Sequence, residues 1–202
     1  MKIAVLGYGN VGKKLSSLFD RAAHEIIIGL RSTSERTANY YSTDFEEAAR
    51  LADVIILAIP FTACASALPA IAKAASGKIV LDVTNPINPD WSPLLLGVEN
   101  SAGEEINRLL PKAHVVKAFN TIFADIMNKP MDQGLAVTAF IAGNSKSAKQ
   151  TVATMASDVG YHPIDVGPIY VARYLENMAH LNIQIAVGQQ QGTDAAFVYL
   201  RS

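Results

Sequence analysis

The segment Gly7-Tyr8-Gly9-Asn10-Val11-Gly12 matches the pattern G-x-G-x-x-G. An apolar stretch of strand length precedes it, and a helical pattern and a second apolar stretch follow, a context typical of a dinucleotide-binding loop. Gly7 permits the tight turn, Gly9 lets a pyrophosphate approach the backbone, and Gly12 lets the helix pack closely on the strand. The helix N-terminus would bind the pyrophosphate through its N–H groups. We therefore expect all six residues to form part of the cofactor site.

The residues after the second apolar stretch distinguish between the two nicotinamide cofactors. An NAD site usually has Asp or Glu there, which binds the ribose 2′-hydroxyl. This chain has instead Arg31 and Ser32, with Arg36 one helical turn further along. Guanidinium and hydroxyl donors suit a phosphate dianion. We therefore expect Arg31, Ser32 and Arg36 to bind the 2′-phosphate of NADP; the alternative interpretation is a solvated basic loop.

Three further segments come at the ends of expected strands. Ile59 and Pro60 end one strand, Asn85 follows another, and Ala118 and Asn120 lie at the carboxyl end of a third. Open α/β sheets bind ligands at the carboxyl ends of their strands, so the two asparagines could bind a ribose or a carboxamide. The alternative for each is a turn residue, because Asn-Pro is itself a turn signal. The functional interpretation depends on the three segments meeting at one edge.

Few other residues suggest chemistry, and no catalytic residue is identified. The single cysteine, Cys64, excludes an internal disulfide and a cysteine-rich metal site, and we interpret it as a small buried thiol. Asp53 and Asp82 are interpreted as a strand-start and a turn residue. For a carbonyl or imine substrate, His180 or Tyr174 would be the first candidates for a general acid.

The elements that must position these residues alternate between strand and helix patterns, which is typical of a parallel sheet covered on both faces. Strands are expected at residues 2–6, 25–30, 39–41, 54–59, 78–83, 115–119, 135–142 and 161–166, with an edge strand at 195–200. Helices are expected at residues 11–22, 43–50, 63–75, 101–111, 145–159 and 169–187. Capping boxes starting at Thr43 and Ser101 predict two of the helix starts. The last helix is apolar on most sides, so we expect it under the sheet or in a subunit interface.

This order predicts an α/β, Rossmann-like, doubly wound and mostly parallel sheet with a small C-terminal helical extension. We expect residues 1–142 to form the NADP-binding domain. Residues 143–202 are expected to pack on it and to supply the acceptor cleft and a dimer interface. They are too few for a second substrate domain of usual size, so we expect the second reactant in a shallow cleft.

Charge and composition exclude several classes of function. The chain has 17 Lys and Arg against 18 Asp and Glu, which argues against nucleic acid and against an anionic membrane surface as partners. Its longest apolar runs, 54–61 and 135–142, are far shorter than the roughly 20 residues of a membrane-spanning helix. Together with the single cysteine, this favours a cytoplasmic location.

The chain resembles the NADPH-dependent reductases of the deazaflavin coenzyme F-420, whose module also forms the cytoplasmic domain of the transmembrane metalloreductases. The resemblance lies in segments 3–12, 29–31, 54–60, 82–86, 116–121, 141–143, 165–168 and 173–176. It implies hydride transfer between NADPH and a ring acceptor, either F-420 or a flavin, and a homodimer. It also implies that Ile59 and Pro60 line the path from adenosine to nicotinamide, and that Ala118 and Asn120 lie beside the nicotinamide.

Coenzyme F-420 has a phosphate and a glutamate tail, so its site should be locally basic, with Lys117, Lys129 and Arg173 as candidates. Two other functions remain open: a non-catalytic NADP(H) sensor, and a small carbonyl or imine reductase. The latter often places a Lys on its C-terminal helix, which this chain lacks after Ile169. Ring-to-ring hydride transfer needs few side chains, so a missing catalytic motif does not exclude an enzyme.

Overall fold

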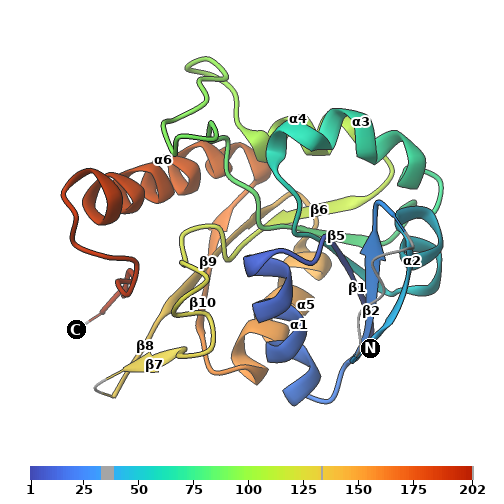
Figure 1. The fold of residues 1–202 in the computed structure, drawn as a ribbon, viewed down its shortest axis with the longest axis horizontal. Helices are drawn as coiled ribbons and strands as arrows, with labels where there is room; N and C mark the ends of the chain where they lie inside the picture. Colours follow the sequence, from blue (N-terminus) through green and yellow to red (C-terminus); the bar gives the residue numbers. More distant parts are fainter. Residues whose placement is uncertain (33–38, 133, 202) are drawn as a thin grey trace.

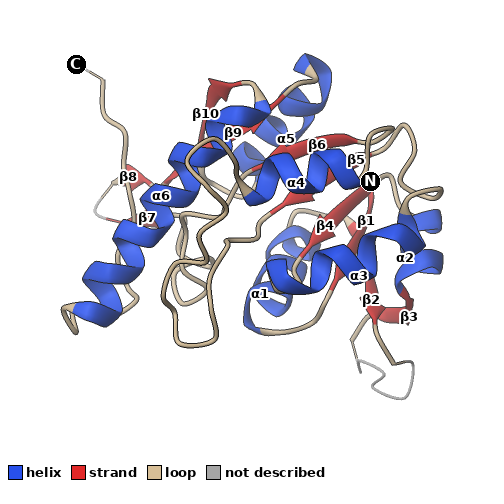
Figure 2. Ribbon diagram, turned by 90° about the horizontal axis from the view of Figure 1, so that it is seen from above, coloured by secondary structure: helices blue, strands red, loops and turns tan. Residues whose placement is uncertain are grey.

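The computed structural model describes residues 1–32, 39–132 and 134–201. Its main sheet has the strand order β10-β9-β6-β5-β4-β1-β2-β3, with helices on both faces (Figures 1 and 2). The strands are β1 (Lys2–Leu6), β2 (Glu25–Leu30), β3 (Tyr41–Asp44), β4 (Val54–Leu57), β5 (Ile79–Asp82), β6 (His114–Lys117), β9 (Thr138–Gly143) and β10 (His162–Gly167). The helices are α1 (Asn10–Arg21), α2 (Phe45–Leu51), α3 (Phe61–Ile71), α4 (Ala102–Leu109), α5 (Lys146–Asp158) and α6 (Ala172–Ile183). A separate small hairpin joins β7 (Met131–Asp132) and β8 (Leu135–Ala136).

Strands β1 to β6 confirm the predicted doubly wound fold. They run parallel in the order 3-2-1-4-5-6, which places the reversal of strand order between β1 and β4. Strand β9 pairs antiparallel with β6, and β10 then pairs parallel with β9. Because open α/β sheets bind ligands where the strand order reverses, the loops after β1 and β4 border the expected crevice.

The central strands are buried on both faces, and alternate side chains enter two separate apolar layers. Ile3 and Val5 of β1 join the layer that contains Phe19 of α1 and Met155 of α5. Ala4 and Leu6 join the layer under α2, α3 and α4. In Figure 1, α1 and α5 lie below the sheet, and α3 and α4 lie above it. Strands covered on both sides need continuous apolar sequence, which explains why the periodicity located them.

The two predicted capping boxes had different outcomes. Ser101 caps α4, since its Oγ accepts a hydrogen bond from the Glu104 N–H at 3.1 Å. Helix α2 is capped by Asp44 instead of Thr43, because the Asp44 carboxylate accepts from the Glu47 N–H at 2.8 Å. Thr and Asp are both good N-caps. Because β3 pairs with β2 as far as Asp44, the helix starts one residue later than predicted.

The edge strand predicted at 195–200 is wrong. The Thr138 N–H donates to the Phe197 carbonyl at 3.0 Å, and the Tyr199 N–H donates to the Thr138 hydroxyl at 2.8 Å. Both bonds are made to Thr138, the first residue of β9. From Thr138 onward β9 pairs with β10, so the tail does not pair along β9 as a strand. The predicted strand 135–142 is likewise divided at Val137 into β8 and β9.

Helix α6 has one buried face and one exposed face. Leu175, Ala179 and Ile183 are buried, whereas Tyr174 and Leu181 are 63% and 54% exposed. Within one chain α6 is therefore buried on one face alone, and the expected place in a subunit interface stays a prediction. So does the domain division at residue 142, which falls within β9. No helix in the described part of the chain is both long and apolar enough to cross a membrane.

An ion pair joins α6 to α4. Arg173 Nε donates to Glu104 Oε2 at 2.9 Å, and Arg173 Nη2 donates to Glu104 Oε1 at 2.8 Å. Burial raises the pKa of Glu104, but the bonds from Arg173 and Ser101 outweigh it and hold this pKa below its ordinary value. The carboxylate form is therefore the form that stabilises the fold.

We predict that Glu104→Gln lowers the free energy of unfolding by about 1 kcal/mol at pH 7. The wild-type advantage should be complete above the ordinary carboxyl pKa, roughly 4.3. It should disappear as the pH falls through the lower pKa of the folded state, because Gln does not titrate. Urea unfolding between pH 7 and pH 3 measures the difference. The control Glu47→Gln removes a carboxylate whose partner, Arg50, lies in the same helix, and should have a smaller effect. If the wild-type protein were more stable than Glu104→Gln by the same amount at every pH, the prediction would be contradicted.

Candidate functional site

The glycine loop follows β1 and leads into α1. A Cβ at Gly7, which has a φ of +97°, would lie 2.5 Å from the Ala58 carbonyl oxygen. A Cβ at Gly12 would lie 2.2 Å from the Gly7 carbonyl oxygen, whereas one at Gly9 would meet no atom within 4 Å. Gly7 and Gly12 therefore allow close packing, and Gly9 leaves space in front of the helix. The N-terminus of α1 has no side-chain cap and no acidic residue in its first turn, which suits an anion.

A cavity of about 1350 Å³, here called the nucleotide hollow, extends from this loop past the end of β2. Four of the residues predicted to bind the cofactor, Gly7, Tyr8, Arg31 and Ser32, line it. Arg36 lies outside the described residues. Small side chains of α3 form a further part of the wall, namely Ala63, Ala67 and Ala70.

The sequence interpretation missed three charged residues of the nucleotide hollow. Lys13 lines it from α1, with its Nζ 5.7 Å from the centroid of the Tyr8 ring. Its position one helical turn after Gly9 was the available signal. Asp44 and Glu46 line the wall near α2, and the Asp44 carboxylate is engaged as the cap of that helix.

A second cavity of about 540 Å³, here called the inner cleft, lies between the carboxyl ends of β4, β5 and β6 and the buried face of α6. Its lining includes Asn10, Val11, Asn85 and Asn120, together with apolar side chains such as Ile87, Trp91, Ile122, Phe123, Met127 and Ile183. Gly9, Ile59 and Pro60 line both cavities. A single elongated ligand could therefore extend from one cavity into the other across these residues.

Two residues of the predicted site line neither cavity. Gly12 packs against the Gly7 carbonyl. Ala118, two residues before Asn120, is fully buried. Eleven of the fourteen predicted residues thus line one or both cavities, and Gly12 packs directly behind the loop that lines them. The other two are Ala118, which lines neither cavity, and Arg36, which lies outside the described residues. The contacts of all fourteen with a cofactor stay predictions.

Asn85 and Asn120 bind each other across two strand ends. Asn85 Nδ2 donates to the Asn120 backbone oxygen at 2.7 Å, and Asn120 Nδ2 donates to Asn85 Oδ1 at 2.9 Å. Asn120 Nδ2 also donates to the Leu175 carbonyl of α6 at 3.1 Å. Within the described part of the chain, the buried Oδ1 of Asn120 has no partner. A buried polar oxygen of this kind needs a donor, so the pair offers an acceptor beside the inner cleft.

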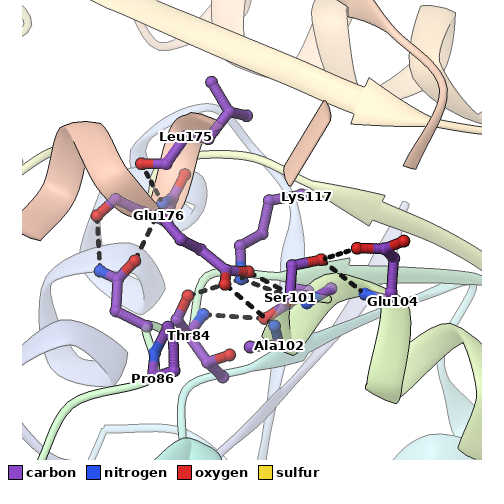
Figure 3. A network of polar contacts seen from close by, with 12 residues as sticks. Thr84, Pro86, Ser101, Ala102, Glu104, Lys117, Leu175 and Glu176 are labelled. Carbon is purple, nitrogen blue, oxygen red and sulfur yellow. Dashed lines mark hydrogen bonds and ion pairs between the residues drawn. The ribbon is translucent and has the colours of Figure 1, made fainter. Parts of the chain in front are cut away.

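A buried network of polar contacts surrounds Lys117 and Glu176 (Figure 3). Lys117 has no exposed surface, and its Nζ lies 2.8 Å from Asp82 Oδ2 and 2.9 Å from Glu176 Oε1. The same ammonium group donates to the Thr84 carbonyl at 2.7 Å. Burial lowers the pKa of Lys117, but Asp82 and Glu176 outweigh it and hold this pKa above its ordinary value. The network therefore contains a charged lysine and fixes the start of the Thr84–Asn85 segment.

Glu176 extends the network from α6 to α4. Its carboxylate accepts hydrogen bonds from the N–H groups of Ala102 and Gly103 at 2.9 and 3.0 Å. The positive end of the α4 dipole thus compensates part of its charge. The interpretation of Asp82 as a plain turn residue is therefore wrong, because its carboxylate binds both Lys117 and the Thr84 N–H.

The three basic residues proposed to bind the acceptor's tail do not line the inner cleft. Lys117 is enclosed by carboxylates, Arg173 binds Glu104, and Lys129 is exposed and lines neither cavity. The two acid candidates are also outside the inner cleft. His180 Nε2 is bonded to the Pro86 carbonyl at 3.0 Å, and Tyr174 faces solvent.

Cys64 is a buried thiol, as expected. Its burial raises the pKa to about 12, so the thiolate is essentially absent near neutral pH. A nucleophilic role therefore has no support in the structure.

Comparisons with known proteins agree with this architecture. A family model described as NADP oxidoreductase, coenzyme F-420-dependent, matches residues 2–86. A solved structure from Arthrobacter sp. FB24, provisionally called an F-420-dependent NADP reductase, is 31% identical with a TM-score of 0.91, and each chain is covered completely. The F-420-dependent NADP reductase of Methanocaldococcus jannaschii is 26% identical over 93% of both chains.

Metalloreductase STEAP3 of Rattus norvegicus is 33% identical over 87% of this chain. That match covers 36% of the metalloreductase, so the chain spans about a third of the length of this relative. The likeness therefore concerns one part of a larger protein.

The buried network generates a prediction about stability. Lys117→Met would leave Asp82 and Glu176 buried without their cation, so we expect the free energy of unfolding to fall by roughly 3 kcal/mol. Urea denaturation at neutral pH measures the loss. The control Lys2→Met removes an exposed lysine that lies 3.5 Å from Glu25, and should cost less than about 1 kcal/mol. Equal losses in the two variants would show that the network does not stabilise the fold.

Proposed function

The chain belongs to the family of coenzyme F-420-dependent NADP oxidoreductases, and from this premise we propose that it is an NADPH-dependent reductase. NADPH would extend from the nucleotide hollow into the inner cleft, where it passes a hydride to a flat ring acceptor of the deazaflavin or flavin type. The observation that carries this proposal is the continuity of the two cavities across Gly9, Ile59 and Pro60.

The residues of the nucleotide hollow fit the charged half of NADPH. The uncapped N-terminus of α1 and the space at Gly9 would accept the pyrophosphate. Arg31 and Ser32 would bind the 2′-phosphate, and Lys13 would add positive charge to the same cavity. NADPH supplies the hydride when bound, so the protein's task is to hold and orient it.

The residues of the inner cleft fit the nicotinamide and an acceptor ring. The unpartnered Oδ1 of Asn120 would accept a hydrogen bond from the carboxamide, and Asn85 and Leu175 hold the asparagine in place. The apolar walls would exclude water from the two rings. Hydride transfer between rings requires orientation and a dry contact. The similarity to F-420-dependent NADP reductases supports a deazaflavin as one acceptor.

We further propose that two copies of the chain associate through the exposed face of α6. Tyr174, Met178 and Leu181 of α6, and Ile185 just beyond its end, recur at helical spacing and leave apolar surface partly exposed. A surface of this kind on a helix favours packing against a second helix.

We expect purified protein to oxidise NADPH when a ring acceptor is present. F-420, FMN, FAD and a ferric chelate are added in turn, and the nicotinamide absorbance is followed. Oxidation above the protein-free rate with at least one ring acceptor would support a reductase. NADPH binding without oxidation by any acceptor would instead favour a non-catalytic NADP(H) sensor.

The cofactor preference gives a second prediction. Arg31→Ala should weaken NADPH binding about tenfold, an energy of roughly 1.4 kcal/mol, because one charge-assisted contact is lost. NADH has no 2′-phosphate, so its binding should not change. Calorimetric titration of both cofactors measures this, with Arg108→Ala on α4 as a control outside the nucleotide hollow. Unchanged NADPH affinity in Arg31→Ala would exclude Arg31 from the phosphate site.

A further inference from the structure

The inner cleft has a charge unsuited to an anionic ligand. Among its described lining residues there is no Lys, Arg or His, and the charged side chain present is Asp125. Asp125 is exposed, and the Thr193 hydroxyl from the C-terminal tail donates a hydrogen bond to it. A phosphate or carboxylate tail that leaves this cleft would therefore pass a negative charge without meeting a compensating cation in the wall.

Of the cations identified above, two are engaged, two line the other cavity, and Lys129 is exposed and lines neither cavity. Lys117 is buried between Asp82 and Glu176, and Arg173 is held by both oxygens of Glu104. Lys13 and Arg31 line the nucleotide hollow and not the inner cleft. The two cations that line a cavity, Lys13 and Arg31, thus lie where the nucleotide phosphates would bind.

One wall of the inner cleft has an aromatic side chain on a constrained turn. Trp91 is the single tryptophan of the chain, lines the cleft, and is 49% exposed. Its φ of +69° lies in the left-handed region, which a bulky residue rarely adopts.

The turn around Trp91 is held by several hydrogen bonds. The Asn88 N–H donates to the Ser92 carbonyl at 2.8 Å, and the Trp91 N–H donates to the Asn88 carbonyl at 3.0 Å. Ile87 and Pro93 pair as an isolated bridge below it. Backbone strain that the surroundings enforce is most often found at ligand sites, and here it presents a large flat ring to the cleft.

We propose that the acceptor of this protein is an uncharged planar ring that stacks on Trp91, and that an anionic tail on the ring weakens its use. The proposal rests on the proposed function and specifies its second substrate. A C–H bond of the dihydronicotinamide breaks, and its hydrogen and electron pair form a new bond to the ring. A proton from water completes the two-electron reduction, and NADP⁺ is the other product. Stacking on Trp91 then favours a planar ring, and the negative charge of Asp125 disfavours a ring with an anionic tail.

Riboflavin and FMN test the charge, because they share one ring and differ by a phosphate. We expect kcat/KM for riboflavin to exceed that for FMN at least about fivefold at low salt, and the ratio to fall as salt screens Asp125. Asp125→Lys should raise kcat/KM for FMN about fivefold and change that for riboflavin less than twofold. The control Asp158→Lys makes the same charge change at the exposed end of α5, outside the cleft, and should leave the ratio unchanged.

Binding without turnover gives a second readout. Because Trp91 is the single tryptophan, its fluorescence can be titrated with riboflavin and with FMN in the presence of NADP⁺. The dissociation constant for riboflavin should be the lower one. Trp91→Ala should raise KM for riboflavin at least about fivefold and leave the affinity for NADPH unchanged, and Trp91→Phe should retain most of the wild-type KM.

The outcomes separate this inference from the proposed function. If no acceptor oxidises NADPH, the proposed function fails. If FMN is used as well as or better than riboflavin, or if Trp91→Ala keeps the wild-type KM, the uncharged stacked acceptor is wrong while the reductase stands. An Asp125→Lys variant that does not favour FMN would also overturn the role given to charge.

Discussion

The position of α6 depends on a lysine with no exposed surface. Lys117 lies at the end of β6 and binds Asp82 at the end of β5 and Glu176 on α6. Glu176 in turn accepts hydrogen bonds from the first two N–H groups of α4. Moving three charges out of water has a large desolvation cost, which is offset only when every charge is paired at short distance. This requirement fixes the strands and both helices relative to one another, and α6 can therefore serve as a wall of the inner cleft.

Backbone geometry forms the opposite wall. The order of strands reverses between β1 and β4, and the loops that follow them approach so closely that Gly7 has no room for a side chain beside Ala58. Gly12 has no room either, because the start of α1 packs against the Gly7 carbonyl. The same approach leaves the N-terminus of α1 open at Gly9. The chemistry we propose thus relies on a helix end, an asparagine pair and apolar walls, in a fold where the ionisable groups beside them serve to hold the structure together.

The sequence predicted what depends on local pattern. Strands β1 and β2 begin and end as expected, the glycine loop lies where its spacing required, and Arg31 lines the nucleotide hollow. It could not predict the bonds of Lys117, because its partners lie 35 and 59 positions away and ordinary turn chemistry explained Asp82 equally well. Thr43 and Asp44 are adjacent capping residues, and only pairing with β2 decides between them. The tail at 195–200 had a strand-like pattern, but it is bonded to β9 at Thr138 alone and joins neither edge of the sheet.

The two cavities share few residues, and this has a consequence for how the protein can change. Arg31, Ser32 and Lys13 line one cavity alone, whereas Trp91 and Asp125 line the other alone. Substitutions in one set need not disturb the other, so preference for the nucleotide and preference for the acceptor can diverge separately during evolution. Gly9, Ile59 and Pro60 have no such freedom, since any replacement there would alter both cavities at once.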